Sequence, residues 1–387
     1  MDMLFGKVDR RFMVFFTRFR LLLAVASVVV AFAPPVQAQV GGGKLLEELV
    51  LGAKKEKELV IGWPGDITPG KESRVNEVFN KRFGLTIKFG GSQKESTDTT
   101  AEAILETRQG LTPTYNVLEM PDVRGSVLVR AGATERIENW DALLKAIDPT
   151  VKSNLVSPGG PLQGHAFAWG HRQKVLIYNP KMIKESELPK TLREMADPKF
   201  KGKFSLSPWV SDAQWGILVY PRDAWLETVK GMGRNITGTY RYTDGIQRML
   251  LGEFPFLPAN ADYYWRFKKQ DPKAPIGVAL FEDLNALEYS VYLVRKGSRS
   301  PNGAKLFTLW AATSEANKLW EDEFGQSGSL ALPSSTVGVE ITRLFTNKKA
   351  KLTSYWDSAK GAEIVEFYTT KEGAEYAKAL GAAQRGK

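Results

Sequence analysis

Short apolar segments alternate with amphipathic helical segments in the first third of the chain. Residues 58–63, 85–89 and 115–120 have the apolar composition of buried strands. Residues 72–83 and 101–109, which separate them, carry apolar side chains at helical spacing. This alternation predicts an α/β fold with a parallel sheet and crossover helices. Ligands of such sheets bind beyond the carboxyl ends of the strands, so the loops there are candidate contacts.

The length of 387 residues exceeds what one ordinary core supports, which predicts two lobes. The chain has no cysteine, which excludes disulfides, thiolate metal sites and cysteine nucleophiles. Its net charge of +10 is spread along the chain rather than gathered in a basic stripe with aromatic residues. The sequence therefore argues against nucleic-acid binding and allows only a mild attraction for anionic ligands.

Residues 1–38 have the pattern of a secretory signal peptide. Basic residues precede the apolar run 21–33, Pro34 and Pro35 interrupt it, and Val36-Gln-Ala38 offers a small-residue cleavage site. The mature chain is expected to begin at Gln39 and to be exported. The alternative is a retained membrane anchor.

The segment 254–265, Phe-Pro-Phe-Leu-Pro-Ala-Asn-Ala-Asp-Tyr-Tyr-Trp, is the strongest candidate for a binding site. It predicts a strand that breaks at Pro258, followed by a helix whose N-cap is Asn260 or Asp262. Tyr263 and Tyr264 then lie in the first turn, where free N–H groups and the helix dipole favour an anion. Two phenols there can face an anion, a metal ion or a cleft. The alternative is that both tyrosines are half-buried packing residues.

Several later segments share the order of a known protein family. They are Val175-Leu-Ile-Tyr-Asn179, the Asp-Pro and Lys-Gly-Lys pattern in 192–203, and the runs 274–281, 290–297 and 304–316. Together with the tyrosine pair, they resemble the periplasmic (extracellular) solute-binding proteins of ABC importers, in the ferric-iron-binding branch.

This resemblance implies a type II periplasmic-binding-protein fold, in which two α/β lobes with mostly parallel sheets enclose a cleft and close by a hinge. The expected lobes are residues 39–168 with 286–387, and residues 169–285. Residues 165–179 and 277–284 would cross between them, and the chain beyond residue 334 would pack on the first lobe. The implied protein is a periplasmic monomer without a cofactor or catalytic activity, which delivers its solute to an inner-membrane ABC permease.

The resemblance also implies a ligand, because adjacent tyrosines supply two phenolates to Fe(III) in that branch. Fe(III) is a hard cation that prefers oxygen donors, and its charge drives the loss of the phenol proton. Arg172 matches a basic residue that holds a small anion beside the ion, and Ser92, in a predicted polar loop over residues 90–100, could assist. The carboxylates that could complete the shell are Asp66, Glu119, Asp122 and Asp262. The histidine that some members place after the first strand is absent from residues 62–66.

Tryptophans at several predicted strand ends favour another ligand. Trp63, Trp169, Trp209, Trp215 and Trp265 lie there, and most are expected in the core. One or two that line the cleft would suit an organic ligand such as a phosphonate, polyamine or carboxylate. The candidate ligand-binding residues are therefore Tyr263, Tyr264, Arg172, Ser92, Asp66, Trp63, Asn260 and Trp209.

Catalysis has little support in the sequence. His165 and His171 are six residues apart on a strand-like segment, which favours polar crossing residues over a shared metal face. No nucleophile motif or phosphate-binding loop is present. The alternative function from another class is a secreted hydrolase on a similar fold, which would require a nucleophile and a base close together in the cleft.

Overall fold

The computed structural model describes residues 37–63, 67–93, 96–325 and 328–386. The predicted signal peptide lies outside these residues except for its last two. Helix α1 begins at Gln37, so the predicted cleavage site falls in the first turn of α1. Within the described residues, no helix combines the length and the hydropathy needed to cross a membrane.

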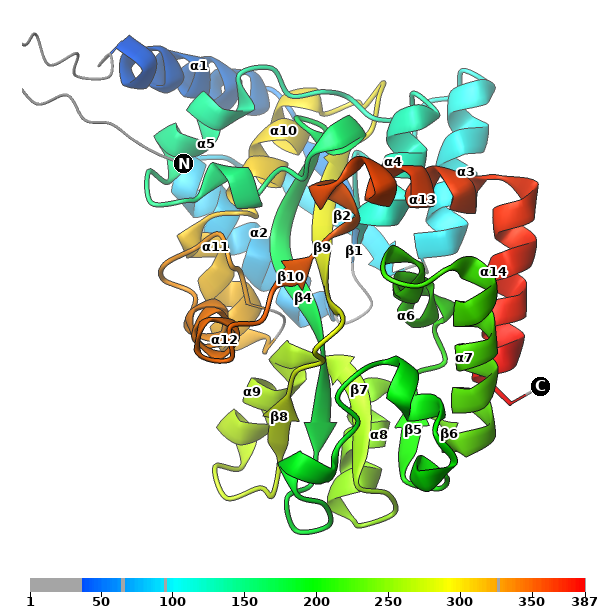
Figure 1. The fold of residues 1–387 in the computed structure, drawn as a ribbon. Helices are drawn as coiled ribbons and strands as arrows, with labels where there is room; N and C mark the ends of the chain where they lie inside the picture. Colours follow the sequence, from blue (N-terminus) through cyan, green and yellow to red (C-terminus); the bar gives the residue numbers. More distant parts are fainter. Residues whose placement is uncertain (1–36, 64–66, 94–95, 326–327, 387) are drawn as a thin grey trace, which may run out of the picture. The chain divides into compact units, whose positions relative to one another are not determined.

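Ten strands form one mixed sheet in the described part of the chain (Figure 1). They are β1 (Glu58–Trp63), β2 (Lys88–Gln93), β3 (Val117–Pro121), β4 (Ala166–Tyr178), β5 (Phe204–Leu206), β6 (Ile236–Thr239), β7 (Phe256–Asn260), β8 (Gly277–Ala279), β9 (Asn285–Val294) and β10 (Leu352–Thr353). The main order is β2-β1-β3-β9-β4-β7-β5-β6, with β10 paired to β9 and β8 paired to β4.

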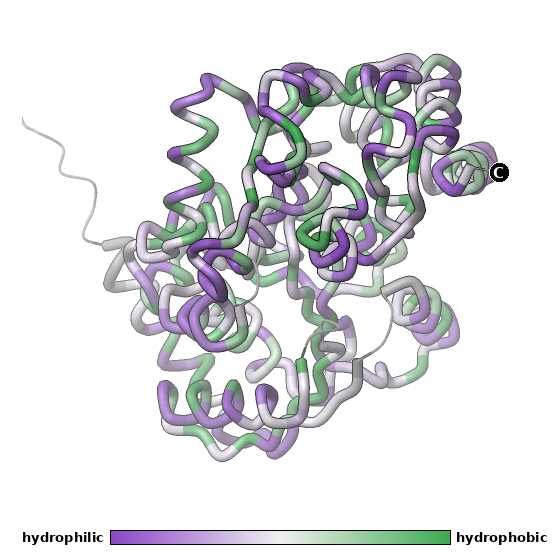
Figure 2. The backbone as a smooth tube through the Cα atoms, turned by 90° about the horizontal axis from the view of Figure 1, so that it is seen from below, coloured by the Kyte–Doolittle hydropathy of each residue, from purple (hydrophilic) through white to green (hydrophobic). Residues whose placement is uncertain are grey.

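The helices flank this sheet. They are α1 (Gln37–Ala53), α2 (Pro69–Phe83), α3 (Ser96–Arg108), α4 (Asp122–Arg130), α5 (Trp140–Ile147), α6 (Val210–Gln214), α7 (Arg222–Asn235), α8 (Tyr242–Leu250), α9 (Ala261–Gln270), α10 (Pro301–Trp310), α11 (Ser314–Asn317), α12 (Thr336–Asn347), α13 (Ala359–Thr369) and α14 (Lys371–Gln384). Along many of them, hydrophilic and hydrophobic residues alternate, as expected for helices that cover a core on one side (Figure 2).

Strands β4 and β9 are the longest and lie side by side in the middle of the sheet (Figure 1). They are antiparallel to each other, whereas β1 pairs in parallel with β2 and β3, and β5 pairs in parallel with β6 and β7. The predicted mixed, mostly parallel sheets are thus joined through an antiparallel centre. Only β1 has the same limits as its predicted segment.

Strand β2 differs from its prediction because glycines allow close contact with β1. Residues 90–93, which we expect in a loop, extend the strand in register with β1, so that Gly91 lies opposite Ile61. Gly91 has a φ of +151°, and a Cβ atom there would lie 1.9 Å from the carbonyl oxygen of Ile61. The pattern that indicates a flexible loop instead marks a close approach of two strands.

Strand β7 continues through Pro258, which corrects the predicted break. Pro258 pairs with Leu176 of β4, and the strand reaches Asn260 before α9 begins. On its other side β7 meets β5 at one residue pair only, Phe204 with Phe256. A proline, which lacks an N–H donor, is tolerated where a strand has a free edge.

The predicted return crossing over residues 277–284 does not form one continuous element. Residues 277–279 form the short strand β8, and the long strand beside β4 is β9. Every residue of β9 is buried, including Asn285, Glu288 and Ser290. These polar residues make the strand hard to predict from the sequence, because an apolar run is the usual sign of a fully buried strand.

The C-terminal segment contacts both the residues expected for the first lobe and the middle of the chain. Helix α14 lies against α7, and Gln384 Nε2 donates to the carbonyl oxygen of Ser207 at 2.6 Å. Arg222 of α7 forms an ion pair with Glu372 of α14 at 2.8 Å. The packing of α14 differs from the expectation, whereas Trp356 and Glu366 contact Asp122 and Arg130, which belong to the expected first lobe.

Arg295, just after β9, is a buried charge that fastens the sheet to α3. Its guanidinium pairs with Glu106 at 3.0 Å and donates to the carbonyl oxygens of Ala133 and Ala103, each at 3.0 Å.

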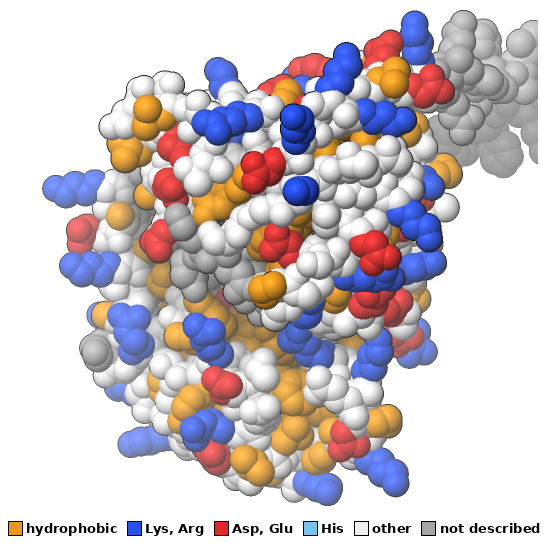
Figure 3. Space-filling model, turned by 180° about the vertical axis from the view of Figure 1, so that it is seen from behind, with side chains coloured by type: hydrophobic (Ala, Val, Ile, Leu, Met, Phe, Trp, Pro, Cys, Tyr) orange, Lys and Arg blue, Asp and Glu red, His pale blue; other side chains and the backbone are white. Residues whose placement is uncertain are grey.

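On the surface of the molecule, basic and acidic side chains are interspersed over the face shown in Figure 3. That face has no continuous basic stripe.

Candidate functional site

The candidate site begins with one face of the two central strands. Arg172 of β4 lies directly opposite Glu288 of β9. Because side chains alternate between faces along a strand, Lys174 and Ser290 share this face with them. Arg172 Nη1 lies 3.6 Å from Glu288 Oε1, which is an ion pair but too long for a hydrogen bond. The Arg172 side chain is 30% exposed.

Carboxylates from three other elements surround this arginine. Although burial alone would lower it, the carboxylates of Glu288, Glu119 and Asp262 raise the pKa of Arg172. Asp262, in the first turn of α9, is only 7% exposed, and its Oδ1 has no hydrogen-bond partner among the described residues. Burial raises the pKa of Asp262, while Arg172, Arg266 and Lys174 oppose that rise.

Lys174 is the centre of a second group of contacts. Its Nζ lies 2.8 Å from Asp212 Oδ1, 2.9 Å from the Tyr242 hydroxyl and 2.7 Å from Asn260 Oδ1. Asp212 Oδ2 also accepts hydrogen bonds from Ser207 Oγ and the Tyr242 hydroxyl. Asp212 and Tyr242 follow β5 and β6, and Asn260 is the last residue of β7. Side chains from the carboxyl ends of all three strands thus meet at one ammonium group.

Aromatic rings border this group. The ring of Tyr242 lies 5.0 Å from that of Trp209 and 5.3 Å from that of Tyr263, between centroids. Trp209 is 38% exposed. The guanidinium of Arg266 lies 5.2 Å from the ring centre of Tyr263.

The two adjacent tyrosines have different surroundings. Tyr263 contacts Tyr242 and is close enough to Arg172 to raise the pKa of that arginine. Tyr264 packs edge-on against Trp265, with 5.1 Å between ring centres. Burial, Glu185 and the Tyr264 phenol raise the pKa of Tyr178, at the far end of β4. The structure therefore brings Tyr263, but not Tyr264, into contact with the Lys174 group.

Asn260 and Ser92 are held by neighbouring side chains. Asn260 occupies the N-cap position of α9, but its side chain makes no capping bond and accepts from Lys174 instead. Ser92 Oγ, in β2, lies 2.8 Å from the hydroxyl of Tyr115, just before β3. Asp66 lies outside the described residues.

Most of the tryptophans expected at strand ends are core residues. Trp63 is 2% exposed, and its ring contacts Phe89 and Phe307. Trp169 and Trp215 are equally buried. Core aromatic rings cover Trp63, so the structure does not bring it to the Lys174 group. Trp209, in contrast, lies beside the Lys174 group, against the ring of Tyr242.

The two histidines have different surroundings. His165 Nδ1 lies 3.0 Å from Thr134 Oγ1. His171 is fully buried, with Nε2 2.8 Å from the carbonyl oxygen of Leu155 and Nδ1 accepting from the Leu330 amide at 3.2 Å. Burial lowers the pKa of His171 to about 4, so the ring is neutral. Among the described residues, no group of three or more His, Cys, Asp or Glu side chains is arranged to hold a metal ion.

Both carboxylate oxygens of Asp122, another of the expected carboxylates, already accept hydrogen bonds. It accepts from its own helix at Val123, from the Tyr289 amide, and from Trp356 Nε1 at 2.8 Å. Burial, followed by the nearby Glu288, raises the pKa of Asp122 to about 7.

Sequence patterns alone do not single out Lys174, Asp212, Tyr242 or Glu288. The available signal is the spacing of Arg172 and Lys174, two residues apart in one strand, which places both on one face. Their acidic partners come from distant segments that only the folded chain brings together.

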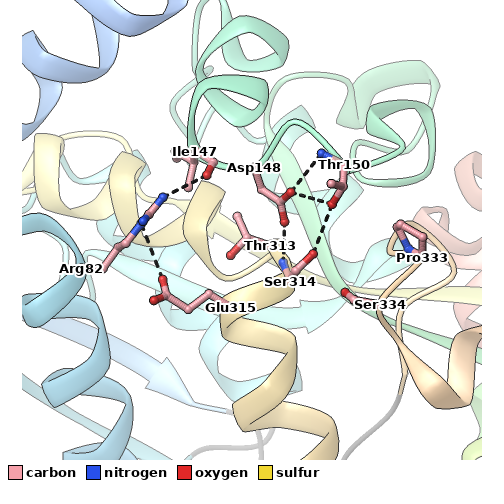
Figure 4. A pocket seen from close by; sticks show the side chains of 9 residues that line it. All are labelled: Arg82, Ile147, Asp148, Thr150, Thr313, Ser314, Glu315, Pro333 and Ser334. Atoms are coloured by element: carbon pink, nitrogen blue, oxygen red, sulfur yellow. Dashed lines mark hydrogen bonds and ion pairs between the residues drawn. The ribbon is translucent and has the colours of Figure 1, made fainter.

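A separate hollow of about 550 Å³ lies between α5, α11 and the end of α2 (Figure 4). Its polar groups bind one another. Asp148 accepts from Thr150 and from the Ser314 amide at 2.8 Å, and Arg82 donates to the carbonyl oxygen of Ile147 at 3.1 Å. Burial would raise the pKa of Asp148, but hydrogen bonds from Thr150 and Ser314 lower it. These contacts secure the ends of helices, and the hollow is distinct from the face of β4 and β9.

Comparison with protein families identifies one match that covers most of the chain. The model of the bacterial extracellular solute-binding protein family matches residues 76–330. The Fe(3+)-binding periplasmic protein of Serratia marcescens is 26% identical over 158 residues, which cover 35% of this chain and 46% of that relative. The chain thus matches less than half the length of that relative.

Solved structures share the fold at low sequence identity. Iron-bound HitA from Pseudomonas aeruginosa has a TM-score of 0.63 at 19% identity, covering 84% of this chain and 99% of its own. The ferric binding protein from Campylobacter jejuni has a TM-score of 0.64 at 15% identity, covering 85% and 99%. AfuA from Actinobacillus pleuropneumoniae, with fructose-6-phosphate bound, has a TM-score of 0.60 at 17% identity, covering 81% and 97%. The predicted fold class is confirmed.

Proposed function

This chain belongs to the family of bacterial extracellular solute-binding proteins, and we propose that it is the solute-binding component of an ABC importer. In this proposal, residues 1–38 direct export to the periplasm and are removed. The mature monomer then captures a small solute over the shared face of β4 and β9. It delivers the solute to an inner-membrane permease, without a cofactor or catalytic step.

The observation that supports this proposal is the convergence of polar groups on that face. Arg172 and Glu288 come from the central strands, Asp262 and Tyr263 from α9, and Asp212 from α6. A solute-binding site needs a few convergent polar groups and aromatic surface. Hydrolysis would instead need a nucleophile beside a base, and the buried ring of His171 is occupied by backbone contacts.

The segments that connect the two proposed lobes support closure by a hinge. We propose lobes formed by residues 39–168 with 286–387, and by residues 169–285, with the solute between them. Strands β4 and β9 carry the chain between these segments, and the packing of α14 on α7 adds a third connection.

Fe(III) with a small anion is the first candidate solute. Tyr263 and Tyr264 would supply phenolates, a carboxylate of Asp262 or Glu119 would add an oxygen donor, and Arg172 would hold the anion. The guanidinium of Arg172 is suited to this role, because it is partly exposed and its pairing with Glu288 is loose.

A ferric titration tests this candidate. Adding ferric citrate to the protein should produce visible absorption from phenolate-to-iron charge transfer. Tyr263→Phe and Tyr264→Phe should each remove much of it, because each deletes an oxygen donor and keeps the ring. The control is Tyr376→Phe, since Tyr376 lies on α14 beside Phe367. Colour that survives both substitutions would rule out these two residues as iron ligands.

A small organic solute is the second candidate, favoured by the rings of Trp209, Tyr242 and Tyr263. A thermal-shift screen with phosphonates, polyamines and small carboxylates tests it. A solute at about 100 times its dissociation constant adds about 2.7 kcal/mol to the free energy of unfolding. A clear shift without visible colour would favour the organic solute over iron.

A further inference from the structure

Lys174 lies in the proposed cleft, yet its ammonium group is fully occupied. An ammonium has three N–H donors, and Lys174 Nζ has three acceptors within 2.9 Å, on Asp212, Tyr242 and Asn260. Its side chain is only 14% exposed. Lys174 is therefore not available to bind an anionic solute directly.

The three acceptors come from three different elements. Asp212 lies in α6, Tyr242 begins α8, and Asn260 ends β7, whereas Lys174 itself lies on the central strand β4. Strand β7 also pairs directly with β4, whereas Lys174 adds a direct side-chain link from β4 to α6 and α8. Removing Lys174 would leave Asp212 partly buried without its counter-ion.

The same contacts determine the chemistry of Tyr242. Its hydroxyl donates to Asp212 and accepts from Lys174. The hydrogen bonds of this hydroxyl are therefore made within the chain. Tyr242 is only 5% exposed and its ring contacts those of Trp209 and Tyr263, so it supports these two rings rather than facing the solute.

We propose that Lys174 is a positioning residue that, through Tyr242, holds Trp209 and Tyr263 as a preformed aromatic subsite for an organic group of the solute. Aromatic faces bind planar groups by stacking and cationic groups by cation–π contact. The cargo is accordingly an organic molecule, or a ferric ion carried in an organic chelate, and not a bare ion. This inference rests on the proposed function and narrows its class of solute.

Binding measurements with Trp209→Ala test the subsite. The probes are spermidine, 2-aminoethylphosphonate, citrate and ferric citrate, measured by calorimetry against the mature protein. For any probe that binds, Trp209→Ala should raise the dissociation constant roughly tenfold, the loss expected for one desolvated aromatic contact. Leu251→Ala, which alters an exposed apolar side chain on the surface, should leave it unchanged.

Two outcomes of this experiment would overturn the proposal in different ways. If a probe binds the wild type and Trp209→Ala equally well, the aromatic subsite is wrong and the proposed function stands. If none of the four probes binds the wild type, the class of organic cargo inferred here is wrong, whereas the family assignment, which rests on the sequence match, stands.

The role of Lys174 is tested without any solute. Lys174→Met should make Trp209 more accessible to acrylamide, because Tyr242 is no longer held beneath it. The Trp209 signal is obtained by subtracting the emission of the same protein carrying Trp209→Phe. Lys174→Arg, which keeps the charge, should restore much of the protection. Equal quenching in the wild type and Lys174→Met would show that Lys174 does not position this ring.

Discussion

At the scale of single residues, burial separates carboxyl groups that are equivalent in the sequence. Asp122, Asp262 and Glu119 all qualify as oxygen donors from their positions in or just after predicted strands. In the structure, Asp122 is bound by three donors, whereas Asp262 is buried with one oxygen unpaired among the described residues. This difference depends on contacts with β9 and with Trp356, far along the chain, so it could not be predicted from local sequence.

Asp122 should make stability depend on pH. Its pKa is about 7 in the folded chain and about 3.9 in an unfolded one. Between these values the folded state holds a proton that the unfolded state has lost. The free energy of unfolding should therefore fall by up to about 1.4 kcal/mol per pH unit from pH 4 to pH 7 and then level off.

Urea denaturation of Asp122→Asn across this range checks the expectation. The substitution removes the titrating group, so its stability should fall less steeply than that of the wild type. Asp244→Asn, at an exposed site, should keep the wild-type slope. Parallel slopes for Asp122→Asn and the wild type would contradict the raised pKa.

At the scale of elements, patterns of apolar spacing predict a strand or helix well when one face or the whole segment is apolar. Residues 58–63 meet this condition and form β1 within the predicted limits. Strand β9 does not, because Glu288 lies within it, and that charge is tolerated only because Arg172 lies opposite. Similarly, the glycines of β2 and Pro258 of β7 are residues typical of loops. In the structure they lie within strands, where Gly91 allows a close approach to β1 and Pro258 pairs with β4.

The link between β9 and α3 should be highly sensitive to mutation. Arg295→Met should lower the free energy of unfolding by about 3–5 kcal/mol, because it leaves Glu106 as a buried charge without its partner. Arg248→Met should change it little, since Arg248 and Glu253 form an exposed pair. Urea denaturation of both variants measures the difference. Equal effects would show that the burial of Arg295 does not control its contribution.

At the scale of the whole molecule, the order of segments along the chain predicts the fold and the family but not the ligand. The proposed lobes share β4 and β9, so closure over a solute should bend these strands rather than separate two independent domains. Small-angle scattering should then show a smaller radius of gyration when ferric citrate, or an organic solute that binds, is present at saturation. An unchanged radius would tell against closure by a hinge.

The packing of α14 on α7 has a consequence for how the chain is made. Tyr376 of α14 donates to the carbonyl oxygen of Arg222 in α7, 154 residues earlier in the sequence. Gly233 of α7 is in such close contact that a Cβ atom there would lie 1.9 Å from the carbonyl oxygen of Ala383. While the ribosome adds the intervening residues, the face of α7 that α14 covers has no partner. That part of the packing can therefore form only after the last residues of the chain have been made.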